Sequence, residues 1–539
     1  MPVQMYLNQG PQDQLLFCSD RSYFTNTGYT CTTNFQLEYR DVDPVSTAKL
    51  GSTARFVIPK AADLLGHVDL LATVNKSDGG GAYGSSATDN AASAWYWVNK
   101  LGFAMIEKIT MTIGSNLIEE ITGEQLDLIN ELMREGKDKL GWHTIMRDCK
   151  PASTNVHLEG AITAAQKGNA IMHAGRGGNV GVGGTLQGDR GFSRLICATA
   201  HDDGDTVVRG TGHKLIVPLG LFFSKHPSQY FPLGAIAGCN DVVLEIKFRP
   251  LAHLRAFNHD DNASTLAITK PTVATNGEFV TDIKLRCTYV HLTGPEAALQ
   301  MNKEHVRLMR QWKNLNFTKS IGEKTDFNWQ VDLSFLHPVS FLVITFRKTD
   351  HIDQADEAAT AVAAEKGYFQ YYGDGRVPTL DHEAGNATTA KDNLKLNSIS
   401  LTLNGQERHP GLTANKLDNH YLKYRVLPQL FSSSDHSEEL LEQHQSTEAT
   451  DTAARAELQS HRHELVGAKN VYVYPFCIHP ESANPSGSVN FSKVSHAKLS
   501  CNVDITAHTD TTPEWRMDVY AVGYNWLQIK DGRGLLSFA

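Results

Sequence analysis

The strongest constraint on the fold of this chain is a pair of internal repeats. The segment ITMTIGSN at 109–116, followed by ITGEQLDLINELM, is answered by ISLTLNG at 399–405, followed by LTANKLDNHYLKY. Each copy combines a strand pattern, a glycine turn and a helix-like piece. A second pair, VPLGLFF at 217–223 and VYPFCI at 473–478, is followed in both copies by His-Pro. The units keep their order, which predicts that one supersecondary arrangement is used twice.

Alternation of apolar and polar residues identifies the building blocks as half-buried β-strands. Such segments lie at 108–113, 242–248, 282–289, 398–403 and 518–529, and Gly, Pro, Asn or Asp bound them. Long polar insertions at 75–93, 151–212, 350–393 and 432–463 separate the strands. Strands with such long connections favour a jelly-roll sandwich over an up-and-down barrel with tight hairpins.

The sequence therefore predicts an all-β chain of two tandem jelly-roll β-sandwich domains with long loop insertions and a short linker helix. A chain of 539 residues is long enough to form two domains, each with its own hydrophobic core. An N-terminal arm and the first domain take 1–294, the linker helix 295–315 and the second domain 316–539. Basic residues of this linker are interpreted as the solvated face of a packed helix; they are Lys303, His305, Arg307, Arg310 and Lys313.

Charge and hydropathy exclude several classes of function. A formal net charge of −9 argues against a protein that holds nucleic acid by a broad basic surface. The sequence contains no run of about 18 apolar residues and no signal-peptide pattern, so we expect no membrane insertion and no secretion. The eight cysteines are scattered without C-x-x-C spacing. They are typical of buried, reduced thiols in a protein made in a cytosol-like compartment.

Few residues in the sequence suggest chemistry. His461 and His463 have the H-x-H spacing that would place two imidazoles on one face of a strand, as in metal-binding jelly rolls. They end a charged insertion, however, and a metal-binding jelly roll would carry a further carboxylate a few residues downstream, where this chain has Val466, Gly467 and Ala468. We therefore predict no catalytic, cofactor-binding or metal-binding residues. N-x-S/T sequons occur at Asn75, Asn262, Asn316, Asn386 and Asn490. Asn490 is discounted because it lies in a strand pattern, and the others carry little weight without a signal peptide, so glycans are left open only as a decoration.

The stretch NPSGSVNFSKVSHAKLSCNVDI at 484–505 is interpreted as scaffold. Asn484, Pro485 and Gly487 fit the first, second and fourth positions of a type I turn. Val489 and Phe491 alternate with polar neighbours, and 499–505 continues the alternation. The pattern predicts a chain reversal that leads into a half-buried strand.

Several of these segments together resemble one known family. PSGSVNFS at 485–492 and the terminal strand DVYAVGYNWLQI at 518–529, ending in GRGLLSFA, resemble the closing signature of the major capsid proteins of large nucleocytoplasmic DNA viruses, the iridovirus and phycodnavirus kind. FVIPKAADLLG at 56–66, the unit at 109–132, LIVPLGLFFSKHPSQYFPLGAI at 215–236 and LNSISLTLNGQER at 396–408 resemble upstream segments of the same family. The matches extend from about residue 50 to the C-terminus.

The resemblance implies a fold and a function. Members of that family are double jelly rolls that trimerise into pseudo-hexagonal capsomers and tile an icosahedral shell. It thus implies a non-enzymatic structural protein of the virion capsid, made in the host cytoplasm. Its partners would be further copies of itself and minor capsid and penton proteins, without direct nucleic acid contact. The residues that the resemblance marks as structural motif are Asn484, Pro485, Ser486, Gly487, Asn490, Phe491, Tyr520, Tyr524 and Asn525.

Two other functions stay open from the sequence. A tandem β-sandwich lectin or receptor-binding spike would bind its ligand through the long insertions. A metal-dependent jelly-roll enzyme would use His461 and His463. The oligomeric state separates the first from a capsid protein, and the metal content separates the second.

Overall fold

The structure is a computed structural model of the whole chain. It describes residues 33–74, 95–97, 101–133, 196–197, 213–257 except 237 and 239, 280–320 except 303, 327–349, 352, 369, 393–408, 471–506 except 481 and 483, and 514–538. No helix in these ranges is long and apolar enough to cross a membrane.

The first half of the chain forms two four-stranded antiparallel sheets, called here the first sandwich. One sheet has the order β1 (Phe35–Val42), β11 (Val280–Leu292), β3 (Leu64–Val74) and β8 (His213–Pro218). The other has the order β2 (Thr53–Ile58), β9 (Val242–Phe248), β5 (Ile106–Ile113) and β6 (Asn116–Thr122). Alternate residues such as Leu285, Cys287 and Tyr289 point into the shared core and are fully buried.

The second half builds the second sandwich in the same way. Its first sheet has the order β12 (His305–Ser320), β20 (Glu514–Lys530), β14 (Pro338–Lys348) and β17 (Val471–Pro475). Two short strands join its margins: β18 (Val489–Asn490) pairs with β14, and β21 (Arg533–Leu536) pairs with β20. The other sheet has the order β13 (Phe327–Asp332), β19 (Ala497–Thr506), β15 (Asn393–Leu403) and β16 (Gln406–Glu407).

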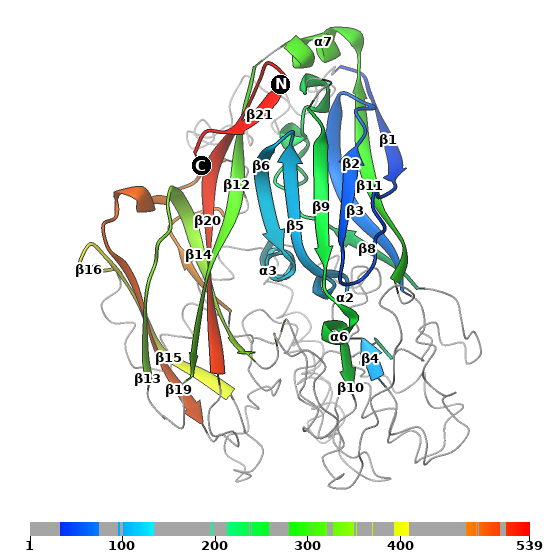
Figure 1. Cartoon of the computed structure of the whole chain (residues 1–539). Helices are drawn as coiled ribbons and strands as arrows, with labels where there is room; N and C mark the ends of the chain where they lie inside the picture. Colours follow the sequence, from blue (N-terminus) through cyan, green and yellow to red (C-terminus); the bar gives the residue numbers. More distant parts are fainter. Residues whose placement is uncertain are drawn as a thin grey trace, which may run out of the picture.

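The two sandwiches have one topology. Taken in chain order, β1, β2, β3, β5, β6, β8, β9 and β11 occupy the same sheet positions as β12, β13, β14, β15, β16, β17, β19 and β20. Eight strands in two sheets, with successive strands crossing between them, are a jelly roll. Figure 1 shows the two sandwiches side by side. The predicted all-β double jelly roll is confirmed, and each of the five predicted strand segments lies within an observed strand.

The internal repeats match equivalent places in the two sandwiches. The hairpin β5–β6 turns at Gly114 (φ 60°), and the hairpin β15–β16 turns at Asn404 and Gly405 (φ 52° and 80°). The helix expected after the first hairpin is α3 (Gly123–Met133). Its counterpart at 412–424 lies outside the described residues. The second repeat pair corresponds to β8 and β17 with the segments that lead to β9 and β19.

The linker helix is shorter than the sequence predicted. α7 covers Gly294–Asn302, and the residues from His305 onward form strand β12 instead. Apolar residues at 306, 308, 309, 312 and 315 give a helix-like spacing, but sixteen paired residues on β20 hold the segment extended. The basic residues His305, Arg307, Arg310 and Lys313 therefore lie on a strand between the sandwiches, which corrects the predicted basic helix face.

The long insertions occupy equivalent connections in both halves. The insertions 75–93 and 350–393 lie between β3 and β5 and between β14 and β15, whereas 151–212 and 432–463 lie between β6 and β8 and between β16 and β17. All four are outside the described residues, apart from β7 and the single residues 352, 369 and 393. β4 (Trp95–Trp97), β7 (Ile196–Cys197) and β10 (Arg255–Phe257) form a small sheet. They lie near α2 (Leu101–Ala104) and α6 (Leu251–Leu254), at the lower end of the first sandwich in Figure 1.

Candidate functional site

The predicted motif at 484–491 closes one end of the second sandwich. Ser486 Oγ accepts from the His479 N–H at 2.9 Å and donates to the His479 carbonyl at 3.0 Å. Gly487 has φ 139°, and a Cβ there would lie 2.7 Å from the Phe476 carbonyl oxygen. Only glycine fits such a close approach without strain. Asn484 and Pro485 are exposed.

The strand expected directly after this turn is interrupted. β18 ends at Asn490, whose side chain accepts from the Ser492 N–H at 3.0 Å and caps a 3₁₀ helix, Phe491–Lys493. Phe491 is buried against Phe335 and Phe476 in edge-to-face geometry. The predicted alternation resumes in β19, where Leu499, Cys501 and Val503 face the core. The side-chain cap competes with strand pairing here, which explains the difference.

The motif residues on β20 lie where the two sandwiches meet. Tyr520 is buried beside Trp312, at 6.4 Å between ring centroids, and burial holds its pKa well above the ordinary value. Asn525 donates to Gln311 Oε1 at 3.0 Å and to the Phe538 carbonyl at 2.7 Å. The guanidinium of Arg310 lies 5.9 Å from the ring centroid of Tyr524. These residues therefore tie β12 and the C-terminal segment to β20.

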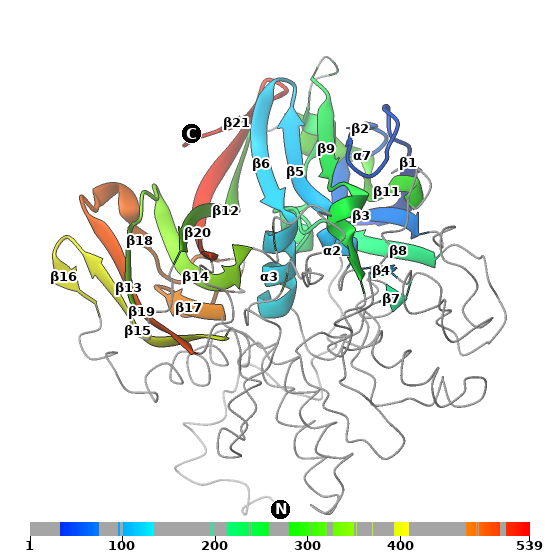
Figure 2. The same ribbon diagram turned by 60° about the horizontal axis from the view of Figure 1, so that its bottom comes forward.

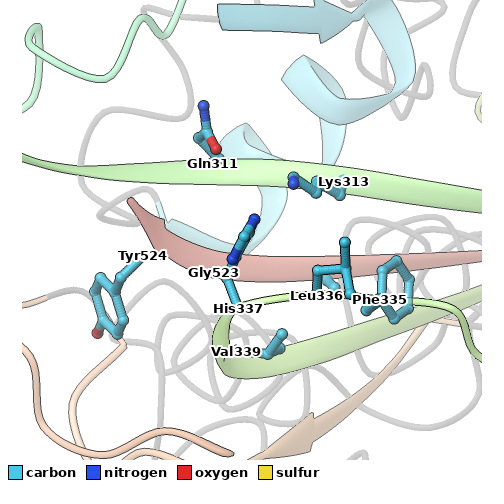
Figure 3. A pocket seen from close by; sticks show the side chains of 9 residues that line it. Gln311, Lys313, Phe335, Leu336, His337, Val339, Gly523 and Tyr524 are labelled. Carbon is cyan, nitrogen blue, oxygen red and sulfur yellow. The ribbon is translucent and has the colours of Figure 1, made fainter. Parts of the chain in front are cut away.

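An open hollow beside this group is small. Residues of β12, of β20, of the segment 335–337 and of the start of β14 line it, and Figure 3 shows them around Gly523. Its volume of about 250 Å³ includes open solvent and is below the usual range for small-molecule sites. Among the described residues, no cluster of three His, Cys, Asp or Glu side chains could hold a metal ion. His461 and His463 lie outside the described residues.

Helix α3 belongs to the first sandwich and packs against the second. Thr122 and Gln125 cap it reciprocally: the Thr122 N–H donates to Gln125 Oε1 at 3.0 Å, and the Gln125 N–H donates to Thr122 Oγ1 at 3.3 Å. Glycine is required at position 123, the first residue of the helix, because a Cβ there would collide with the carbonyl oxygens of Ile106 and Phe103. The T-x-x-Q signal therefore fixes where the helix starts.

The far side of α3 packs on the outer face of the β12–β20–β14–β17 sheet, as Figure 2 shows. Leu128 and Leu132 are buried there, in a cluster that is separate from both sandwich cores. The sheet contributes Phe341, Val343, Val471, Val473, Tyr520 and Val522. Burial of this apolar surface makes the junction between the sandwiches a permanent part of the fold.

Buried charges complete the junction. Arg249, at the end of β9, donates to Glu124 of α3 at 2.6 Å and to the carbonyl oxygens of residues 104 and 106. Arg347 Nη1 lies 3.9 Å from the same Glu124 carboxylate. Burial alone would raise the pKa of Glu124, but the two arginines lower it below the ordinary value. The carboxylate therefore stays ionised and links both sandwiches.

Arg347 also belongs to the second sandwich's own network. It donates to Asp518 Oδ2 at 2.5 Å, and Arg516 Nε lies 2.7 Å from Asp518 Oδ1. Arg347 and Asp518 have no exposed side-chain surface. The sequence interpretation missed this chain of five charges. In the sequence, the network could have been indicated by a charged residue within an otherwise apolar strand pattern: Arg347 in FLVITFRK and Asp518 in MDVYAV.

A ribbon of β12, β20 and β21 makes a third contact between the sandwiches. Met309, Leu527 and Ile529 belong to the core of the first sandwich, although they lie on strands of the second. Side-chain amides of Asn116 and Asn240 donate to the carbonyl oxygens of Gly534 and Gly532, at 3.1 and 2.8 Å. These contacts hold the two sandwiches rigidly together. Within the described residues, no group of side chains is arranged for catalysis.

Comparison with known proteins matches this architecture. Residues 22–293, half of the chain, match the family model described as the N-terminus of the major capsid protein. A major capsid protein of Paramecium bursaria Chlorella virus 1 is 24% identical over 352 residues, covering 61% of this chain and 68% of the relative. A major capsid protein of Phaeocystis pouchetii virus is 35% identical over 77 residues, covering 14% of this chain and 15% of the relative.

Solved structures show the same fold. A quasi-atomic model of the PBCV-1 virus capsid matches with a TM-score of 0.59 at 17% identity, over 96% of this chain and all of the other. The Faustovirus major capsid protein matches with a TM-score of 0.58 at 12% identity, over 95% of this chain and 93% of the other.

Proposed function

Because this chain belongs to the family of viral major capsid proteins, we propose that it is the repeating subunit of an icosahedral virion shell. In this proposal three chains associate into a capsomer with a pseudo-hexagonal outline, and capsomers tile the shell. The observation that carries the proposal is the repeated strand order. Two sandwiches of one topology in each chain let three chains present six similar edges.

The rigidity of the junction supports this role. A tile must keep its shape while many modest contacts add up over a shell. Leu128 and Leu132 pack across the junction, and Glu124 pairs with arginines from both sandwiches. The relative orientation of the two sandwiches is thus held by apolar burial and by directional charge pairs together.

We place the division between the domains at α7, with 1–294 as the arm and first domain, and assign β12 to the second domain. The proposed partners are further copies of the chain and minor capsid and penton proteins, with no direct contact to nucleic acid. The proposed location is the virion capsid after synthesis in the host cytoplasm. Glycans stay a proposal; Asn316 and Asn490 are the described sequons. The family assignment favours this function over a lectin, a spike or an enzyme.

The test is the mass of the purified protein by light scattering, followed by negative-stain imaging of the same peak. We expect particles of about 180 kDa, three times the 59.4 kDa chain, with a pseudo-hexagonal outline. A folded protein that stays at 59.4 kDa at all accessible concentrations would contradict the proposal.

A further inference from the structure

The ribbon of β12, β20 and β21 has one covered face and one open face. On the covered face, Met309, Leu527 and Ile529 belong to the core of the first sandwich. Successive residues of a strand point to opposite sides, so the residues between these three point away from that core. Figure 1 shows β21 and the adjoining ends of β12 and β20 at the same end of the molecule as α7.

Large apolar side chains gather on the open face of the ribbon. Leu308 of β12 is paired with Trp526 of β20, and in the next row Val306 and Leu535 are both paired with Gln528. The exposed fractions of Val306, Trp526 and Leu535 are 59%, 41% and 51%, and Leu308 is half-buried. These four apolar residues are called here the ribbon patch. Neighbouring exposed apolar side chains of this kind are typical of an interaction surface.

The margin of the ribbon patch is basic. Arg533 is exposed and lies two residues before Leu535 on β21, so both side chains are on the same side of the strand. The nearby Lys530 is paired with Glu304, at 2.8 Å between the amine and the carboxylate. A segment that covers the patch should therefore combine apolar side chains with an acidic one that meets Arg533.

The N-terminal arm, residues 1–32, contains such a segment. The arm lies outside the described residues. Its longest apolar run is LLFC at 15–18, and Asp13 stands two residues before Leu15. In an extended segment Asp13, Leu15 and Phe17 would share one side. The acid and the leucine then have the same spacing as Arg533 and Leu535 on β21.

The arm also joins the described chain close to the ribbon. Phe35, at the start of β1, is paired with Leu292, and α7 begins two residues after Leu292 and leads to β12. The nine residues of α7 span about 14 Å. The sixteen residues 18–33 can span up to about 50 Å. The apolar run of the arm can therefore reach the ribbon patch of its own chain.

We propose that residues 13–17 of the arm dock on the ribbon patch of the same chain. In this arrangement Leu15 and Phe17 cover the apolar side chains of the patch, and Asp13 pairs with Arg533. The short connection favours docking within one chain, because it holds the arm at a high effective concentration near the patch. The proposal goes beyond the proposed function, since it concerns a contact within a single chain.

The first test measures how fast trypsin cleaves the full-length protein after Arg21. Arg21 is the only lysine or arginine before Arg40, so this cleavage releases one defined peptide, 1–21. Trypsin cuts a segment only while it is free of tertiary contacts, so docking of residues 13–17 should slow the release. Mass spectrometry of the peptide gives the rate.

Two double variants should speed the release of this peptide. Val306→Asp with Leu535→Asp changes the patch, and Leu15→Asp with Phe17→Asp changes the arm. We expect each to raise the rate at least about tenfold, because burial of a single leucine or phenylalanine already shifts an equilibrium by that factor. The combination of all four substitutions should add little, since both pairs remove the same contact.

The matched control is Val45→Asp, at a 68% exposed apolar position beside β2 of the first sandwich. It should leave the rate of cleavage unchanged. The patch variant should melt within a few degrees of wild type, because both of its positions are exposed. Equal rates of cleavage in wild type, patch variant and arm variant would contradict docking of the arm.

The second test locates the arm by cross-linking. A Leu535→Cys protein is treated with a short bismaleimide, separated on a denaturing gel and digested with trypsin. We expect the native Cys18 in peptide 1–21 to be linked to the new cysteine in peptide 534–539, within the band of a single chain. The matched control Glu407→Cys, at an exposed position on β16, should give no link to Cys18.

The outcomes identify the occupant of the patch. The same link in a band of two chains would show that the arm of one copy covers the patch of another, and would overturn docking within one chain. No link, together with unchanged cleavage in the patch variant, would mean that the arm does not cover the patch. Neither readout measures trimers, so these results leave the proposed function standing, and a wild type that stays monomeric leaves docking of the arm standing.

Discussion

Arg347 on β14 donates to Asp518 on β20 at 2.5 Å, and neither side chain has any exposed surface. Removal of one member of such a buried pair leaves an uncompensated charge in the interior. The pair also adjoins the junction, since Arg347 lies near Glu124 of the first sandwich. The network therefore serves both the second core and the pairing of the sandwiches.

We expect Arg347→Met to destabilise the protein by about 3–5 kcal/mol, because Asp518 then stays buried with fewer partners. Thermal unfolding of the variant gives the measurement. The double variant Arg347→Met with Asp518→Asn should recover part of the loss, since it removes the unpaired carboxylate. A single variant as stable as wild type would mean that Arg516 alone satisfies Asp518.

Gly487→Ala tests the turn of the predicted motif. The variant combines an unfavourable φ of 139° with a Cβ 2.7 Å from a backbone oxygen, so we expect a loss of roughly 1–3 kcal/mol. Gly405→Ala is the matched control. It has φ 80° but no atom within 4 Å, so its loss should be smaller. Equal losses in denaturant titrations would show that the close approach to Phe476 carries no cost.

Leu128→Ala tests the apolar part of the junction. We expect a loss of about 2–5 kcal/mol, because Leu128 is fully buried between α3 and the second sandwich. Leu117→Ala, at a 50% exposed position on β6, should change the free energy of unfolding by less than about 0.5 kcal/mol. Two variants of equal stability would contradict the view that α3 holds the sandwiches together.

Glu119 predicts a pH dependence of stability. Burial raises the pKa of this carboxyl to about 8, although the Phe222 N–H donates to it at 3.2 Å. In the unfolded chain the ordinary value of 4.5 applies, so the folded state binds more protons between these two values. Its stabilising contribution is complete below pH 4.5 and is lost as the pH rises through about 8.

The variant Glu119→Gln removes this titration and keeps a group that accepts from Phe222. We expect it to match wild type near pH 4.5 and to exceed it at pH 8, by at most on the order of 4 kcal/mol. Unfolding midpoints measured from pH 5 to 9 give the comparison. Parallel curves for the two proteins would show that Glu119 does not titrate in this range.

The sequence predicted the strands well where alternation and burial agree. In β19, for example, Leu499, Cys501 and Val503 face the core and their neighbours face outward. Alternation failed at β12, where apolar spacing is compatible with a helix and only pairing with β20, some two hundred residues later, decides the structure. Such pairing has no local signal.

The junction was beyond sequence interpretation for the same reason. Arg347 and Asp518 are 171 residues apart, and each has the appearance of an ordinary charge within a strand pattern. The sequence predicted a helix-like piece after the first glycine turn, and the structure shows that Thr122 and Gln125 cap its start. Nothing near it indicated that Leu128 faces a second sandwich, because an apolar helix face does not name its partner.

The duplication of one topology within a chain has a genetic consequence. In a ring of six identical sandwiches, one sequence must serve every contact, and each substitution appears six times. Here the two copies have diverged: Trp312, Val522 and Phe341 stand where the other copy has Asp41, Arg286 and Asp69. Selection can thus keep the junction within the chain hydrophobic while the matching face of the first sandwich keeps exposed charged pairs, whose strength depends on ionic strength.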